Sequence, residues 1–197
     1  MNLRFALAPL VLAAAAVSAQ AQQVSFRGKV EDMPAQPGRF VVGCTDTELT
    51  SSVVKLNAFV GQQVELSGAW NGSSSAPVVD VATMAATNKL FEVGGGGKIG
   101  TDLSFKVTSQ PGDFTVMFAA LDAGFMPAHR AGVLLLSVSP LLTVASGFVA
   151  PDGTLEVKGS IPNDPALDGL VIYGQAFVSF TAGGADLSNP DCVTLHS

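Results

Sequence analysis

The chain has 197 residues, of which 48% are hydrophobic and only 13% are charged, and its formal net charge is −6. A typical soluble domain carries about 25% charged residues. The excess of acidic residues argues against nucleic acid as a partner, because phosphates would be repelled, and the same holds for acidic membrane surfaces. Low charge together with 21 Gly and 11 Pro is typical of sheets joined by tight turns. We therefore expect an all-β protein.

The first 21 residues have the pattern of a secretory signal peptide. One positive charge, Arg4, precedes an apolar run from Phe5 to Val17, and small residues stand at Ala19 and Ala21. The apolar run is shorter than the roughly 20 residues that a membrane-spanning helix needs. A transmembrane barrel would carry girdles of aromatic residues, whereas this chain has one Trp and one Tyr. We expect cleavage after Ala21 and a secreted or periplasmic protein without membrane insertion.

Residues 22–90 read as a small barrel. Apolar alternation bounded by turn signals predicts five strands, at 24–32, 38–45, 51–57, 62–70 and 76–84, with a short helical or turn segment at 56–60. The stretch LNAFVGQQVELSGAWNGSSSAPVVDVATM resembles the small OB-type barrels of exported bacterial proteins. In those barrels a Leu, two residues, an aromatic residue, Val and Gly close the barrel bottom. The resemblance implies an OB-like five-stranded barrel.

The glycine run at 94–97 lies in a change of composition. Gly95, Gly97 and Gly100 have the spacing of a dinucleotide-binding fingerprint, but the following residues, TDLSFKV, alternate as a strand and not as the required helix. We interpret 91–100 as a Gly-rich joint between two domains. Beyond it, residues 101–197 contain about seven apolar-alternating runs, which predicts a β-sandwich.

The segment SIPNDPALDG predicts a tight corner before the most strand-like run of the chain. Asp and Pro suit the cap and first position of one helical turn, an apolar residue points inward, and Gly suits the exit. The corner residues are Asp164, Pro165, Leu167 and Gly169. The alternative is a ligand or calcium site formed by Asn163, Asp164 and Asp168.

The last 45 residues carry a second resemblance. Ile161 to Gly169, then Tyr173, Gln175 and Ala176, and finally 187–189 match the pattern IPNDPxLxGL, YxQA and LSN. This pattern is similar to that of a C-terminal module found in many exported proteins of environmental bacteria. The family is functionally uncharacterised, so the resemblance implies a β-sandwich and export but no activity.

Catalytic and metal-binding signatures are missing from the sequence. The two histidines, His129 and His196, have no nucleophile context, and no His or Cys spacing typical of metal sites occurs. The acidic residues are spread almost singly, which does not favour the paired carboxylates of a glycosidase. We expect no enzymatic activity, no cofactor and no metal.

Three residues remain as candidates for a site. Cys44 and Cys192 either form a disulfide, as exported proteins favour, or are buried free thiols in different domains. Trp70 stands beside the Asn71-Gly72 turn, where it either fills a rim or core position or stacks on a sugar ring.

Two functions from different classes are compatible with these features. The first is a non-catalytic structural or interaction module of the bacterial envelope or extracellular space, whose partner is an unknown protein or polysaccharide. The alternative is a carbohydrate or small-ligand binding protein, since barrels of OB type bind oligosaccharides.

Export makes the first testable prediction. Mass spectrometry of the protein recovered from an export-competent host should find Gln22 as the first residue, or Gln20 if the peptidase uses the Val17-Ser-Ala19 site. Recovery of the chain with Met1 in place would contradict the prediction.

Overall fold

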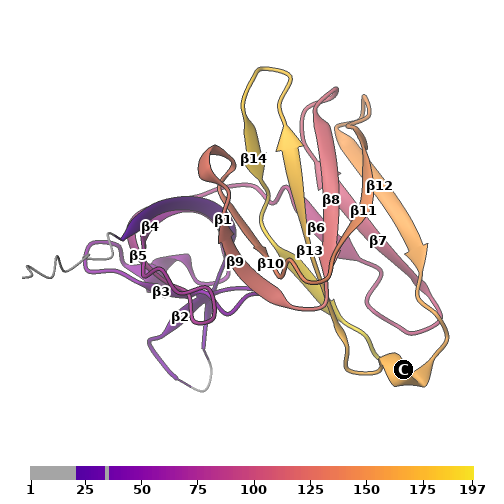
Figure 1. Cartoon of the computed structure of the whole chain (residues 1–197), viewed down its shortest axis with the longest axis horizontal. Helices are drawn as coiled ribbons and strands as arrows, with labels where there is room; N and C mark the ends of the chain where they lie inside the picture. Colours follow the sequence, from indigo (N-terminus) through magenta and orange to yellow (C-terminus); the bar gives the residue numbers. More distant parts are fainter. Residues whose placement is uncertain (1–20, 34–35) are drawn as a thin grey trace, which may run out of the picture.

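The computed structural model describes residues 21–33 and 36–197 (Figure 1). The predicted signal peptide, apart from Ala21, lies outside these residues. The described part is all-β, as predicted, and its helical segments are three 3-10 turns of three or four residues. Within that part, no helix is long and apolar enough to cross a membrane.

The first unit is a closed five-stranded barrel, which confirms the OB-like prediction. Its strands follow one another around the barrel in the order β1-β2-β3-β5-β4, and the β3–β5 pair is parallel while the others are antiparallel. The elements are β1 (Gln22–Asp32), β2 (Phe40–Val42), β3 (Glu48–Thr50), η1 (Leu56–Phe59), β4 (Gln63–Trp70) and β5 (Val78–Ala86). Gly68 lets β4 bend at a bulge, because a Cβ there would overlap the carbonyl oxygen of Asp80.

The third strand lies at Glu48–Thr50, so the prediction of a strand over 51–57 was wrong. The hydroxyl of Ser51 accepts hydrogen bonds from the backbone N–H groups of Val53 and Val54, at 3.1 and 2.8 Å. It also donates to the carbonyl of Val81 at 2.7 Å. Side-chain bonds of this kind compete with a sheet ladder and bend the chain. The predicted helical segment at 56–60 is confirmed as η1.

The second unit is a two-sheet sandwich. One sheet has the order β11-β8-β13-β14, with β15 also pairing to β13, and the other has the order β12-β7-β6. The strands are β6 (Phe91–Gly94), β7 (Asp102–Thr108), β8 (Phe114–Ala120), β11 (Leu141–Phe148), β12 (Thr154–Ser160), β13 (Val171–Ser179), β14 (Ala185–Leu187) and β15 (Asp191–Thr194). The core between the two sheets includes Phe91, Phe105, Met117 and Val178.

The glycine run belongs to the sandwich and is not a joint between the units. Phe91–Gly94, expected in the joint, forms β6 and pairs with β7. Gly95, Gly96 and Gly97 have φ of 99°, 72° and 77°, which only glycine adopts readily, and they turn the chain from β6 into β7. The chain passes from barrel to sandwich at 87–90, immediately after β5.

A hairpin from the second unit lies between the barrel and the sandwich (Figure 1). It consists of β9 (Ala123–Pro127), η2 (His129–Ala131) and β10 (Val133–Leu136). All four residues of β10 are buried. Val133 and Leu135 belong to the barrel core, while Leu134 and Leu136 pack with Ala120 and Leu187 of the sandwich. Because successive side chains of a strand point to opposite faces, the apolar run VLLL buries one face in each unit.

The hairpin also covers one end of the barrel. Phe125 of β9 packs against the inward-facing Phe26, with ring centroids 5.9 Å apart, and against Trp70, at 5.0 Å. Leu56 of η1 is buried at the opposite end, where the N–H of Gly61 donates to the carbonyl of Val30 at 2.8 Å. The barrel interior is therefore filled from both ends.

The two-sided hairpin predicts that both units unfold together. Leu135→Ala should lower the free energy of unfolding by about 2 to 5 kcal/mol, because it leaves a cavity in a packed core. In a urea titration, fluorescence of Trp70 reports on the barrel, and far-ultraviolet circular dichroism reports on the strands of both units. The urea midpoints of the two probes should coincide in the wild type, and Leu135→Ala should shift both by the same amount.

Val53→Ala is the matched control, because this side chain is 72% exposed in a barrel loop. It should change stability by less than about 0.5 kcal/mol. Separate transitions for the two probes would contradict a shared core.

Candidate functional site

The residues singled out in the sequence lie in two places. Cys44, Cys192, Trp70 and Gln175 lie where the barrel, the hairpin and the sandwich meet, which we call the inter-unit interface. The corner residues lie at one end of the sandwich, close to the C-terminus (Figure 1).

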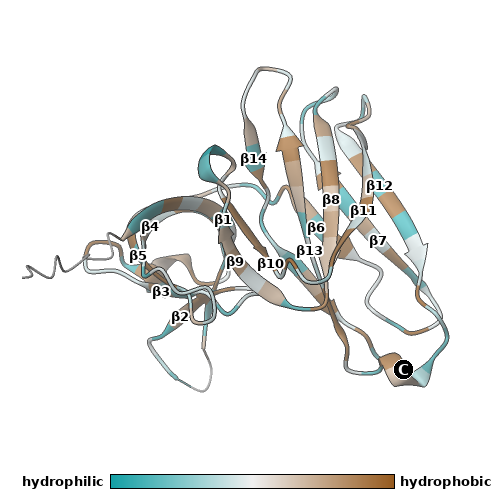
Figure 2. Ribbon diagram, viewed as in Figure 1, coloured by the Kyte–Doolittle hydropathy of each residue, from teal (hydrophilic) through white to brown (hydrophobic). Residues whose placement is uncertain are grey.

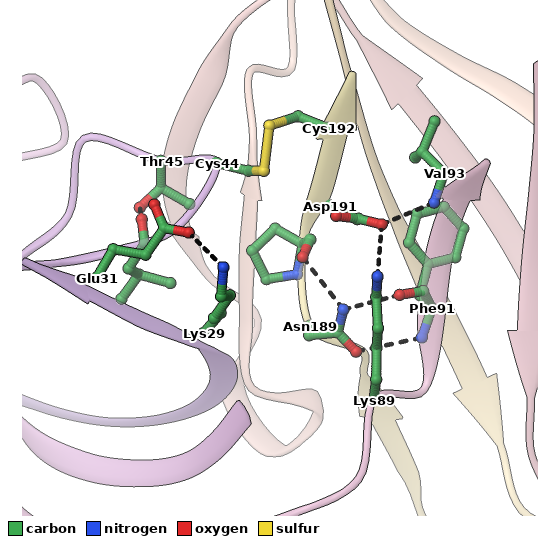
Figure 3. The surroundings of a disulfide bond; sticks show 12 residues. Lys29, Glu31, Cys44, Thr45, Lys89, Phe91, Val93, Asn189, Asp191 and Cys192 are labelled. Carbon is green, nitrogen blue, oxygen red and sulfur yellow. Dashed lines mark hydrogen bonds and ion pairs between the residues drawn. A yellow bond between two sulfur atoms is a disulfide. The ribbon is translucent and has the colours of Figure 1, made fainter. Parts of the chain in front are cut away.

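Cys44 and Cys192 form a disulfide across the inter-unit interface (Figure 3), which confirms the paired alternative. Their Cα atoms are 5.6 Å apart at a sequence separation of 148 residues. Cys44 follows β2 in a turn, with φ of 59°, and not within the strand as expected. Cys192 lies on β15. Closing so long a loop restricts the unfolded chain, which the chain-entropy model values at about 5 kcal/mol.

A groove of about 480 Å³ runs beside the disulfide. Its charged side chains are already paired with one another. Lys29 Nζ lies 2.9 Å from Glu31 Oε1, and Lys89 Nζ lies 2.9 Å from Asp191 Oδ2. Asp191 also accepts a 2.8 Å hydrogen bond from the backbone N–H of Val93 (Figure 3). These charges therefore fix the groove walls and do not converge on a vacant point.

Gln175 of β13 holds the hairpin against the sandwich. Its side chain is fully buried. Oε1 accepts from the N–H of Leu135 at 2.8 Å, and Nε2 donates to the carbonyls of Val133 and Ser188 at 3.1 and 2.8 Å. The amide thus satisfies backbone groups on the edge of β10, as a neighbouring strand would.

Asn189 performs the same task where the chain enters the sandwich. Its Oδ1 accepts from the N–H groups of Leu90 and Phe91, at 2.8 and 3.2 Å. Its Nδ2 donates to the carbonyls of Phe91 and Pro190, at 2.9 and 3.1 Å (Figure 3). Together Gln175 and Asn189, from the YxQA and LSN motifs, use their side-chain amides to join distant backbone segments.

An ion pair crosses the interface beside the hairpin. Arg27 of β1 donates to Asp186 of β14 at 2.9 Å and to the hydroxyl of Thr87 at 2.9 Å, and it lies 3.2 Å from Glu65. Burial raises the pKa of the Asp186 carboxyl, and the hydrogen bond and charge of Arg27 oppose that rise. The pair orients β14 against the barrel wall.

Trp70 occupies a half-buried position at the barrel rim. Its ring packs on Phe125, and its indole N–H donates to the carbonyl of Ser73 at 3.0 Å. These contacts agree with the interpretation of Trp70 as a rim residue of the barrel. Its one hydrogen-bond donor is occupied, and a ring face is covered by the hairpin.

The acidic corner has the geometry expected for a turn. Asp164 caps η3 (Pro165–Leu167) by accepting from the N–H of Ala166 at 2.9 Å, and Pro165 stands at the first position. Leu167 packs on the sandwich core, and Gly169 leaves the turn with φ of 82°. The carboxylate of Asp168 accepts from the N–H of Ser197 at 2.9 Å. Within the described residues, no group of three His, Cys, Asp or Glu could hold a metal ion.

Asp113 is a buried carboxylate that the sequence did not single out. It joins loops at the end of the sandwich near Thr181. It accepts from the hydroxyl of Ser109 at 2.6 Å, the N–H of Gln110 at 3.1 Å, and the N–H and hydroxyl of Thr181 at 2.8 and 3.0 Å. Burial opposes its charge, but these hydrogen bonds outweigh burial and hold the pKa of the carboxyl below its ordinary value. The turn sequence QPGD was the only local signal.

Neither a scan against protein-family models nor a search of curated proteins returned a match.

The inter-unit hydrogen bonds predict a large cost for replacing Gln175. Gln175→Leu should leave the N–H of Leu135 and the carbonyls of Val133 and Ser188 buried without partners. At about 1 to 3 kcal/mol for each unpaired group, the free energy of unfolding should fall by about 3 kcal/mol or more. Urea denaturation measures the loss.

Gln110→Leu serves as control, because this residue is exposed and should tolerate the same change within about 0.5 kcal/mol. A loss below about 1 kcal/mol for Gln175→Leu would show that the amide does not support the interface.

Proposed function

We propose that the mature chain is a non-catalytic structural or interaction module of the bacterial envelope or extracellular space. The observation that carries the proposal is the use of its buried polar side chains. Gln175 and Asn189 bind backbone groups, and Asp113 binds backbone and hydroxyl groups, of this same chain. Groups committed in this way build an architecture and are not presented to a substrate.

The connection between the two units supports a structural role. The shared hairpin, the Arg27–Asp186 pair and the disulfide all oppose separation of barrel and sandwich. A protein that closes on its ligand needs a hinge between its parts, whereas a scaffold gains from their fixed geometry. The arrangement favours a scaffold.

The disulfide fits an extracellular or periplasmic protein, because such bonds persist in oxidising compartments. With the signal-peptide pattern, this supports release to the periplasm or beyond. The partner we expect there is a protein or polysaccharide of the envelope. Removal of residues 1–21 takes away Arg4 and lowers the formal net charge to −7, which disfavours acidic polymers as partners.

One observation favours the second candidate, a carbohydrate or small-ligand binding protein. A shallow, mostly apolar groove of about 440 Å³ lies between Ser74 and Ser75 of the β4–β5 loop and Phe125, Met126 and Val138 at the hairpin. The loop between the fourth and fifth strands is one place where OB-type barrels bind oligosaccharides. Trp70 lies next to this groove through its contact with Phe125.

Co-sedimentation with isolated envelopes tests the proposed function. The purified mature protein should be retained saturably on envelopes of a bacterium that exports it, and protease or polysaccharide-degrading treatment of the envelopes should identify the partner's class. If the protein is not retained on envelopes and hydrolyses model glycosides or esters, the proposal of a non-catalytic module is wrong.

The sole Trp separates the two candidates in the same preparation. For an interaction module, soluble oligosaccharides should leave the emission of Trp70 unchanged, because its contacts lie within the protein. A saturable shift in emission, with sugar binding weakened at least about tenfold in Met126→Glu, would favour the carbohydrate-binding alternative. Val53→Glu provides a control at another accessible apolar side chain, which is 72% exposed against 44% for Met126.

A further inference from the structure

Most exposed edges of the sandwich are protected against pairing with another chain. The edge of β6 is capped by side chains, since Asn189 and Asp191 accept from the N–H groups of Phe91 and Val93. The edge at β14 faces the barrel through Asp186. β12 carries Glu156 and Lys158. Charges and covering groups of this kind are the usual defences of edge strands.

β11 carries a bulge, which is one defence of an edge strand, but no charged side chain. It is the edge strand of the larger sheet, at the side of the sandwich away from the barrel (Figure 1). Its eight residues, LLTVASGF, include no charge, and no charged residue occurs between Arg130 and Asp152. Leu142 is 59% exposed and Phe148 is 69% exposed. An extended, uncharged edge with exposed apolar side chains is suited to receiving another strand.

We propose that β11 pairs antiparallel with β11 of a second copy of this chain, forming a two-fold symmetric dimer with a continuous sheet. The inference deepens the proposed function, on which it rests, by naming one partner of the interaction module. Two-fold pairing of identical strands requires that the strand be complementary to itself.

The bulge in β11 makes the strand self-complementary in one register. Val144 is the extra residue, since Thr143 pairs with Phe118 and Ala145 with Met117. The side chains that share the outer face with Phe118 are therefore Leu141, Thr143, Ser146 and Phe148, while Leu142, Val144, Ala145 and Gly147 lie on the face of the sandwich core. Both sets are symmetric about the point between Val144 and Ala145.

A two-fold axis at that point matches the side chains of the two copies. Phe148 of one copy lies opposite Leu141 of the other, and Thr143 lies opposite Ser146. The exposed Leu142 lies opposite Gly147, which offers no side chain to obstruct it. Apolar and hydroxyl pairs across neighbouring strands are the pairs that stabilise sheets.

β12 does not oppose the same interface with like charges. Gly147 of β11 lies beside Leu155 of β12, because a Cβ at Gly147 would be 3.5 Å from Leu155 Cδ2. Glu156 and Lys158 of β12 lie 3.8 Å apart in one chain. This second sheet edge therefore carries one charge of each sign and no net charge.

Sedimentation of matched charge variants tests the dimer and its register. The wild-type mature protein should have the mass of two chains at tens of micromolar. T143E/S146E puts like charges opposite each other twice across the axis and should raise the dissociation constant at least about tenfold. T143K/S146E puts opposite charges at the same positions and should restore the dimer to wild-type affinity or tighter.

The control is S52E/V53E, which adds the same two negative charges at exposed barrel positions and should leave the dimer intact. Thermal melting confirms that each variant is folded. A wild-type protein of single-chain mass at every concentration, or a dimer that T143E/S146E leaves unchanged, would overturn the proposal, as would equal weakening by both charge pairs. A monomer that is still retained on envelopes overturns the dimer alone, whereas a dimer without retention overturns the proposed function alone.

Discussion

The structure depends on the burial of both faces of β10. A strand whose four residues are all apolar cannot lie at a surface, so Val133 and Leu135 enter the barrel core while Leu134 and Leu136 enter the contact with the sandwich. Figure 2 shows this hydrophobic segment between the two units. Neither unit is complete without it, because the hairpin covers the barrel end through Phe125 and the outer face of the larger sheet through Leu134 and Leu136.

A strand placed between two cores creates a problem for its backbone. The edge of β10 that faces β13 is not paired with it by strand hydrogen bonds. Unpaired backbone groups in an apolar interior are costly. The amide of Gln175 solves this by accepting from Leu135 and donating to Val133. A hydrocarbon side chain of the same size would fill the space and leave these groups unpaired. The buried amide therefore sets the position of the hairpin, and the disulfide and the Arg27–Asp186 pair hold the same arrangement from the two sides.

This architecture gives the molecule two different ends. At the barrel end, the interior is filled and the polar groups of the interface are paired within the chain. At the other end, β11 presents an uncharged edge (Figure 1). Pairing through that edge would leave both barrels outermost and free to meet other components. A molecule whose two units are held in a fixed arrangement, with one edge strand open to pairing, is suited to assembly. This is consistent with the proposed function of the chain.

The sequence by itself determined the features that local hydrogen bonds and alternation control: the all-β class, four of the five barrel strands, η1, and the capped corner at Asp164 and Gly169. It misplaced the third strand, because the bonds of Ser51 to Val53, Val54 and Val81 leave no mark in a hydrophobic pattern. It also interpreted β6 as part of a joint. Only the tertiary structure decided that Cys44 meets Cys192 and that Gln175 is buried against β10. Pattern and spacing report on neighbours along the chain, whereas these contacts depend on how the two-sided hairpin sets the barrel against the sandwich.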